Sequence, residues 1–357
     1  MTFHSLFGDV PVRVRRLKSC PCQGASRQSF STIFTNKNPV APELSFLTAK
    51  LAALMPFGKA AAVLAELLPC ASGTNAATVH NRTRRVGQRL EQQAQKDEKD
   101  DQALSSAPPA PAPAKEGVLG LDGAYVRSRH RRPEKNFEVI VGKALGEGGT
   151  AIRFAFPTNH PGAEALIRRA LRRQGIDETT PLTVFSDGEA GLRELQRKVA
   201  PNATHILDWF HVAMRFEHLL NLAQGQPPPE PSALADMRAW SLDLIDRAKW
   251  ALWNGQSWKT QAYLEDLCGW CHARRPETPR VLLQLGKAAQ DLWGYLETNR
   301  DSLPNYGKRY RAGLPISTAF TESAVNEIVA KRMNKSQQMR WNRYTARAVL
   351  DGPGSCT

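Results

Sequence analysis

The sequence lacks any uninterrupted apolar run near the roughly 18 residues that a membrane-spanning helix needs. Its amino terminus, MTFHSLFGDVPVRVRRLK, also lacks the apolar core of a secretory signal. Cysteines are few: the chain has 6, irregularly spaced, which argues against the dense disulfide framework of a small secreted domain. We therefore expect a cytoplasmic protein that makes no use of a membrane.

Acidic residues are scarce relative to basic ones. The chain has 48 Lys and Arg against 34 Asp and Glu, which gives a formal net charge of +14 at pH 7. This balance favours a polyanionic partner, with nucleic acid first and an acidic membrane surface second. Phosphate contacts supply affinity without reading bases, so composition leaves sequence specificity open.

The length of 357 residues allows two or three domains. Changes in composition and periodicity divide the chain, and the order of strand-like and helix-like runs after the linker is βββαβαβ. This order is the opening of an RNase H-like domain, so we predict an α/β fold. The predicted parts are a basic segment (1–46), a helix-turn-helix domain (47–93), a disordered Pro/Ala-rich linker (94–117), the first part of the RNase H-like core (118–211), an all-helical insertion (212–312) and the last core helix with the carboxyl terminus (313–357).

The predicted helix-turn-helix domain offers a candidate DNA-binding surface. Asn75 is placed to cap its third helix. Along that helix, apolar side chains are predicted to face the core and three arginines to face DNA, as in a recognition helix. A solvated basic face on an ordinary helical bundle explains the pattern equally well. The inward residues are Val79, Val86 and Leu90, and the outward ones are Arg82, Arg85 and Arg89.

Three acids stand at the edges of predicted elements: Asp122 in LGLDGAYV, Asp187 in VFSDGEAGL and Glu322 in TAFTESAVNEI. Each has an ordinary explanation, as a turn residue, a helix N-cap and a first-turn acid respectively. Phosphodiester cleavage with two Mg²⁺ or Mn²⁺ ions about 4 Å apart instead requires a shared carboxylate cluster. The order of the three acids favours such a site.

Three motifs carry a resemblance to a known family: LGLDGAYVRSRH, VFSDGEAGLRELQRKVAPNATHILDWFHVAMRF and GLPISTAFTESAVNEIVAKRMNKSQQMRW. Together they resemble the DDE transposases of ISKra-type insertion sequences, which are related to the Mutator-like group. The resemblance covers most of the chain. It implies that Asp122, Asp187 and Glu322 are the catalytic, metal-binding acids. The Asp-x-x-His signature of the wider group falls on Asp208 and His211, which would support the site or position DNA.

The resemblance also implies activity and partners. We expect metal-dependent cleavage and strand transfer at the ends of a bacterial insertion sequence, with two Mg²⁺ or Mn²⁺ ions per site. The partners would be double-stranded DNA, at terminal inverted repeats and target, and further copies of the chain on that DNA at the nucleoid. From spacing alone, His211 is equally well explained as a buried, hydrogen-bonded histidine.

A second basic stretch follows the last predicted acid. Its cations would contact backbone phosphates beside the cut site, although a solvated charged face has the same sequence pattern. The predicted contacts are Lys331, Arg332, Lys335 and Arg340.

Two cysteine motifs remain open. Cys20 and Cys22 in CPC supply half of a zinc site at most, because a structural zinc ion normally takes four ligands. Cys268 and Cys271 in CGWCH match a haem-attachment pattern, but their helical context favours two packed thiols, with a partial zinc site second.

The last residues, WNRYTARAVLDGPGSCT, end soon after the MRW motif, where the resembled family generally continues. We therefore expect a truncated carboxyl terminus and keep two hypotheses: an active transposase, and an inactive derivative that still binds DNA. An RNase H-like nuclease unrelated to transposition is disfavoured by the final motif.

Overall fold

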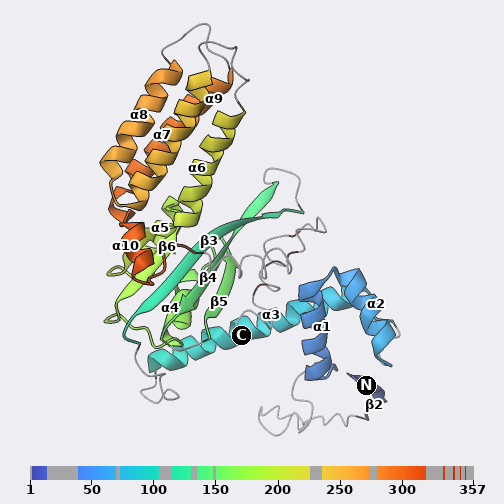
Figure 1. Cartoon of the computed structure of the whole chain (residues 1–357). Helices are drawn as coiled ribbons and strands as arrows, with labels where there is room; N and C mark the ends of the chain where they lie inside the picture. Colours follow the sequence, from blue (N-terminus) through green and yellow to red (C-terminus); the bar gives the residue numbers. More distant parts are fainter. Residues whose placement is uncertain are drawn as a thin grey trace.

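The computed structural model describes residues 2–13, 39–69, 73–103, 114–129, 135–147, 150–225, 235–272 and 280–318, with the single positions Met333, Trp341, Ala346 and Leu350. This part of the chain is a mixed α/β structure, with ten α-helices and a mixed five-stranded sheet (Figure 1). None of its helices is both long enough and apolar enough to cross a membrane.

The amino-terminal part is more regular than the sequence predicts. A short antiparallel hairpin, β1 (Thr2–Ser5) and β2 (Gly8–Pro11), lies within the basic segment (1–46), for which the sequence predicts no helix or strand. Helix α1 (Pro42–Leu54) begins five residues before the predicted domain boundary, because Pro42 fits the first turn of a helix, where no backbone donor is needed. Helices α2 (Phe57–Leu67) and α3 (Ala76–Ala103) complete the predicted three-helix unit.

Helix α3 confirms part of the predicted pattern. Asn75 Oδ1 accepts a hydrogen bond from Thr78 N (2.9 Å), as predicted for the cap. Val79 is fully buried, but Leu90 is 37% exposed, so its predicted inward position is wrong. The reason is that α3 contacts α1 and α2 with its first turns and then continues beyond them (Figure 1).

The arginines of α3 differ in exposure. Arg85 and Arg89 are exposed, as predicted, whereas Arg82 is half-buried. The helix also runs through 94–103, which the sequence predicts as linker. The residues there, AQKDEKDDQA, include good helix formers, so the charge run extends the helix instead of ending it. Of the rest of the predicted linker, 104–113 lies outside the described residues. The prediction of a linker is wrong for its end, because Ala114 N donates to Gly175 O and Gly117 begins the first strand of the sheet.

The sheet has the order β5-β4-β3-β6-β7, antiparallel from β5 to β3 and parallel from β3 to β7. The predicted element order βββαβαβ is confirmed. The elements are β3 (Gly117–Arg127), β4 (Asn136–Leu145), β5 (Ile152–Pro157), α4 (Ala163–Arg172), β6 (Leu182–Ser186), α5 (Ala190–Val199) and β7 (Thr204–Leu207).

The two faces of the sheet are covered differently. Leu119 and Leu121 of β3 pack against α4 and α5, which cover one face. Ala124 and Val126, which alternate with them, pack on the other face against four residues of the carboxyl-terminal segment. Those four are Met333, Trp341, Ala346 and Leu350. Asp122 shares the parity of Ala124 and Val126, so it lies on the face against which these four residues pack.

Trp341 is a structural residue. Its side chain is buried, its indole Nε1 donates to Met333 O (3.0 Å), and its backbone bonds to Arg127 and Arg129 at the end of β3. The MRW motif therefore anchors the chain to the sheet through its tryptophan.

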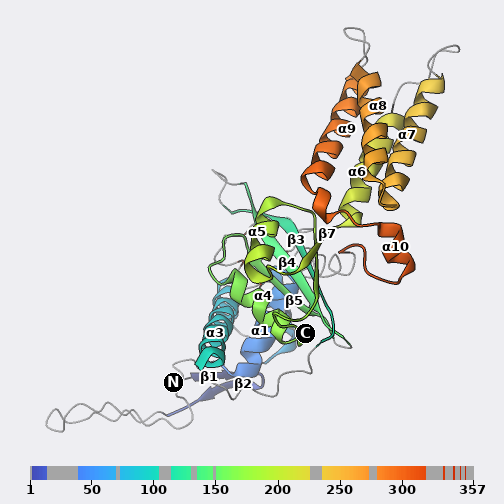
Figure 2. The same ribbon diagram turned by 90° about the vertical axis from the view of Figure 1, so that its left-hand side faces the viewer.

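Between β7 and residue 312, the regular elements in the described part of the chain are all helices, in agreement with the helical pattern predicted for 212–312. Helices α6 to α9 form a bundle that projects from the sheet on the side away from α1 to α3 (Figures 1 and 2). A 3₁₀ turn and a short helix then return the chain to the sheet. The elements are α6 (Trp209–Gln224), α7 (Ala235–Trp253), α8 (Ser257–His272), α9 (Arg280–Thr298), η1 (Arg300–Ser302) and α10 (Tyr306–Arg311).

Candidate active site

Three aspartates form a row at one edge of the sheet. Strands β3, β6 and β7 are parallel neighbours, and the pairs Gly120↔Phe185 and Ser186↔Leu207 fix their register. Continued past the strand ends, this register aligns Asp122 with Asp187, and Asp187 with Asp208. Residues in register on parallel strands point to the same face, so the apolar runs that end in Asp187 and Asp208 bring both acids to one edge.

The structure excludes the ordinary explanation of Asp122. It pairs with Val141 within an uninterrupted ladder, and the next residue, Gly123, pairs with Ile140, so no turn occurs here. Asp187 is not the N-cap of α5 either, since that position is Glu189. Asp187 Oδ1 instead accepts a hydrogen bond from Glu189 N (2.9 Å) in the loop before the helix.

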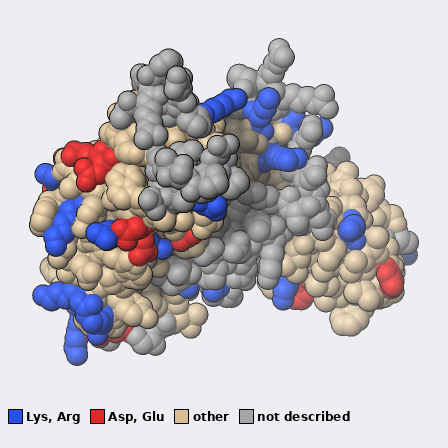
Figure 3. Space-filling view, turned by 45° about the horizontal axis from the view of Figure 1, so that its top comes forward, with Lys and Arg blue, Asp and Glu red and all other residues tan. Residues whose placement is uncertain are grey.

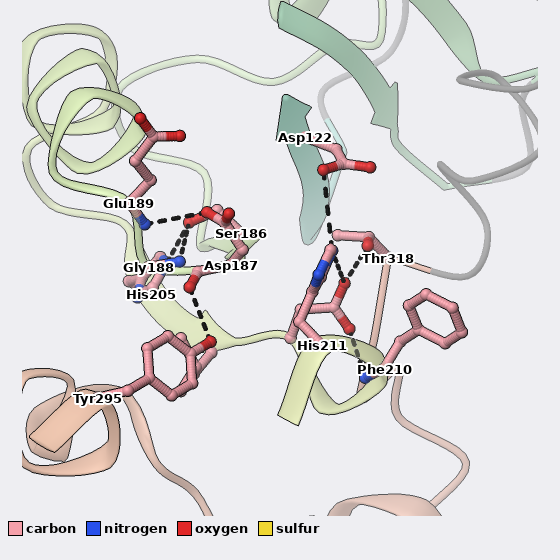
Figure 4. A network of polar contacts seen from close by, with 12 residues as sticks. Asp122, Ser186, Asp187, Gly188, Glu189, His205, Phe210, His211, Tyr295 and Thr318 are labelled. Carbon is pink, nitrogen blue, oxygen red and sulfur yellow. Dashed lines mark hydrogen bonds and ion pairs between the residues drawn. The ribbon is translucent and has the colours of Figure 1, made fainter. Parts of the chain in front are cut away.

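His211 lies between two of the acids, as Figure 4 shows. Its Nε2 atom is 3.7 Å from Asp122 Oδ1 and also 3.7 Å from Asp208 Oδ2. The histidine side chain is 29% exposed, so it is not the fully buried residue that one interpretation of the spacing predicts. A protonated imidazole here would interact favourably with both carboxylates.

Asp208 is the most buried of the acids. It is the N-cap of α6, with Oδ1 accepting a hydrogen bond from Phe210 N (2.8 Å). Thr318 Oγ1 donates to Asp208 Oδ2. The Asp208 carboxylate thus caps α6 and ties the chain after α10 to the site.

Burial and neighbouring charge act together on Asp122. Burial raises the pKa of its carboxyl, and the negative charges of Asp187 and Asp208 raise it further, while His211 opposes them. The negative charges of the three carboxylates therefore repel one another. A bound cation would reduce this repulsion.

Near Asp187 lie two residues, Tyr295 and Arg215, that the sequence analysis does not identify. The hydroxyl of Tyr295 donates to the backbone oxygen of Asp187 (2.8 Å), and the Arg215 guanidinium lies over the Tyr295 ring, 3.9 Å from its centroid. Arg215 is exposed and lies one helical turn after His211 on α6. A lone arginine in a helix gives no sequence signal for such a position.

A buried histidine also lies behind the row. His205 of β7 is hydrogen bonded through Nε2 to Ser186 Oγ (2.8 Å) and through Nδ1 to Ser302 Oγ (2.7 Å). Burial lowers the pKa of His205 to about 3, with smaller contributions from Arg193 and Arg197. The imidazole is therefore neutral at pH 7.

This lowered pKa predicts acid sensitivity. The unfolded chain takes up a proton at His205 near pH 6.5, whereas the folded chain does so only near pH 3. The stabilising contribution is thus complete above about pH 6.5 and is lost as the pH falls towards 3. Between pH 7 and 5 we expect His205 to lower the free energy of unfolding by about 2 kcal/mol.

Urea titrations at the two pH values will measure this loss. His205→Gln should reduce it by about that amount, and exposed His218→Gln is the control. Equal pH dependence in the two variants would contradict the expectation.

The remaining predicted positions have mixed outcomes. Cys268 and Cys271 are packed thiols: burial raises the pKa of both, that of Cys271 to about 12, and Cys268 Sγ donates to Gly286 O. This agrees with the first of the interpretations of CGWCH. The predicted residues that lie outside the described part of the chain are Cys20, Cys22, Glu322, Lys331, Arg332, Lys335 and Arg340.

The donor chemistry of the row suits a hard divalent cation. Mg²⁺ and Mn²⁺ take oxygen ligands, and carboxylates are supplied by Asp122 inside β3 and by Asp187 just after β6, the neighbouring strand. Within the part of the chain that the structure describes, no three His, Cys, Asp or Glu residues are grouped closely enough to hold a metal ion alone. The two aspartates therefore fit as part of a ligand set that a further acid would complete.

Comparisons with known proteins add no family. No family model matches the chain, and no curated protein matches it. One similar solved structure, described as the crystal structure of NurA, is 14% identical over 69% of this chain and 72% of its own, with a TM-score of 0.12. A similarity that low carries no argument about fold or function.

Proposed function

We propose that this chain is a bacterial DNA transposase that cleaves and joins phosphodiester bonds at the ends of an insertion sequence by a DDE mechanism. The observation that carries the proposal is the row of Asp122, Asp187 and Asp208 at one edge of the sheet, with His211 3.7 Å from two of them. The first and last of these acids, Asp122 and Asp208, are 86 positions apart in the chain.

The proposal includes an RNase H-like fold for the sheet domain. Its support is the element order βββαβαβ, with the helical bundle inserted directly after β7. In this interpretation Asp122 lies on the first strand of the domain and Asp187 follows the fourth. The bundle separates them from the carboxyl-terminal segment that carries the predicted third acid.

Asp122, Asp187 and Glu322 would hold Mg²⁺ or Mn²⁺, which when bound would activate a water or 3′-hydroxyl and stabilise the leaving oxygen. The chain's own groups do the positioning. Asp208 caps α6 and so fixes the start of the helix that carries His211. His211, between Asp122 and Asp208, would hold the Asp122 carboxylate in place or contact a DNA phosphate.

DNA binding is assigned to basic side chains on more than one part of the molecule. Arg85 and Arg89 are exposed on α3, and Arg82 lies half-buried beside them. Figure 3 shows Lys and Arg side chains in several separate areas of the face in view, with Asp and Glu side chains among them. The net charge of +14 favours contacts with DNA phosphates in more than one of these areas. We keep Lys331, Arg332, Lys335 and Arg340 as further contacts.

The natural substrates would be terminal inverted repeats and target DNA, held by several copies of the chain in the bacterial nucleoid. Inverted repeats beside the coding region would distinguish a transposase from an unrelated nuclease.

A second candidate is an inactive derivative that binds DNA without cutting it. Cutting then depends on whether the segment with Glu322 completes the site.

Nicking of supercoiled plasmid by the purified full-length protein tests the proposal. We expect open-circular and linear products in Mg²⁺ or Mn²⁺ and none after addition of EDTA, because the carboxylates would promote cleavage only by holding a divalent cation. Binding without cutting, by a folded protein in either metal, would support the inactive derivative. EDTA-resistant cutting would contradict the metal mechanism.

A further inference from the structure

Where the chain leaves the helical bundle and returns to the sheet, four of its residues lie against the ends of β6 and β7. These two strands are followed by Asp187 and Asp208. The four residues come from three consecutive elements, at intervals of four, three and four positions. Each one contacts the main chain or a close neighbour of Asp187 or Asp208. They are Tyr295 in the last turn of α9, Asn299 at the N-cap of η1, Ser302 at the end of η1 and Tyr306 at the start of α10.

The first two contacts fix the loop around Asp187. The Tyr295 hydroxyl donates to the Asp187 backbone oxygen (2.8 Å), which sets the peptide plane beside the carboxylate (Figure 4). Asn299 fills the space beside Gly188, and its own amide is fixed by donating to Tyr295 O (3.0 Å). Gly188 has φ +80°, so the loop turns sharply where Asn299 packs against it.

The third contact is made through the buried histidine. Ser302 is hydrogen bonded to His205, and His205 to Ser186, the residue before Asp187. Ser186 Oγ in turn accepts a hydrogen bond from Gly188 N (3.3 Å). This chain of side chains links η1 to both residues that flank Asp187.

The fourth contact is made beside Asp208. Tyr306 is fully buried, and its hydroxyl donates to Leu207 O (2.8 Å). Asp208 N donates to Ser186 O (2.9 Å), so the two strand ends are also tied to each other. The bundle end therefore holds both acid-bearing loops by their backbones.

We propose that Tyr295, Asn299, Ser302 and Tyr306 form a positioning element that sets the orientation of Asp187 and Asp208. The inference rests on the proposed function of the site and adds that the helical bundle belongs to the cleavage apparatus. A catalytic carboxylate must be held to within about 0.5 Å, and a loop outside the strands needs outside support to achieve this. None of the four residues is itself a catalytic residue, because each acts through the loops.

The test compares Tyr295→Phe with Tyr310→Phe in the full-length protein. Both changes remove one phenolic hydroxyl from the same end of the bundle, but Tyr310 is 65% exposed. Three quantities are measured: hydrogen–deuterium exchange of the segment 186–190, the Mn²⁺ concentration for half-maximal binding by electron paramagnetic resonance, and plasmid nicking. We expect Tyr295→Phe to speed exchange in that segment and to raise the Mn²⁺ concentration about 10-fold, with no change in Tyr310→Phe.

The outcomes separate this inference from the proposed function. Unchanged exchange and unchanged Mn²⁺ binding in Tyr295→Phe would overturn the positioning element, even if the wild-type protein cuts DNA. Faster exchange at 186–190 would support it, even if the wild-type protein cuts nothing and the proposed function fails. Ser302→Ala, which removes the link to His205, provides the same test if Tyr295→Phe does not fold.

Discussion

Replacement of Asp187 by asparagine should abolish metal-dependent cutting while DNA affinity stays equal or rises. The amide keeps the volume of the side chain and can still accept the hydrogen bond from Glu189 N, so the loop should fold normally. It loses the negative charge that a divalent cation requires. Changes to groups that only support metal ligands cost about 10- to 100-fold, and we expect loss of a direct ligand to cost more than about 100-fold.

DNA affinity is expected to behave differently because the removed charge repels phosphate. Fluorescence anisotropy with a labelled duplex should give a Kd equal to or below that of the wild-type protein. Asp291→Asn, at an exposed position of α9, is the matched control and should change neither property. Wild-type cutting rates in Asp187→Asn would remove this residue from the catalytic set, whereas loss of both cutting and binding would point to misfolding.

The proximity of Asp187 and Asp208 could be predicted from the sequence, because each residue directly follows a short strand. Two short apolar runs that each end in an aspartate predict that Asp187 and Asp208 lie together if the strands are parallel neighbours, and they are. Asp122 is different, because it lies inside β3 and comes beside Asp187 only through the register of β3 with β6. The period of a strand fixes which face each side chain points to, but the register between two strands is not a local pattern.

The supporting contacts could not be predicted, since they join residues about 100 positions apart. Tyr295 bonds to the backbone of Asp187 and Tyr306 to that of Leu207, and a backbone acceptor leaves no mark on the sequence. The extension of α3 was missed for another reason. Charged residues typical of a solvated linker are also good helix formers, so the charge run does not separate the two states.

Gly188→Ala should destabilise the fold and stop cutting, which makes it the sharpest test of how tightly the Asp187 loop is held. Gly188 has φ +80°, where an alanine costs about 1–2 kcal/mol. The added methyl would also lie 2.8 Å from Leu207 Cδ1 and closer still to the amide oxygen of Asn299. Crowding of this kind costs about 1–3 kcal/mol, so we expect the free energy of unfolding to fall by about 2–5 kcal/mol in total.

Gly191→Ala is the matched control. Gly191 lies in the first turn of α5 with open space around the position of an added methyl, so alanine should leave stability unchanged or raise it by about 0.5–1 kcal/mol. Urea unfolding measures the effect on stability, and plasmid nicking below the unfolding transition measures the effect on activity.

Because Gly188 is adjacent to Asp187, a folded Gly188→Ala protein should still cut poorly, since the displaced loop carries the carboxylate with it. Removing the Asn299 side chain in the same protein should recover part of the stability, because it relieves the crowding but leaves the backbone strain. Full activity in Gly188→Ala would mean that the Asp187 loop tolerates displacement and that its close packing against Asn299 has no role in catalysis.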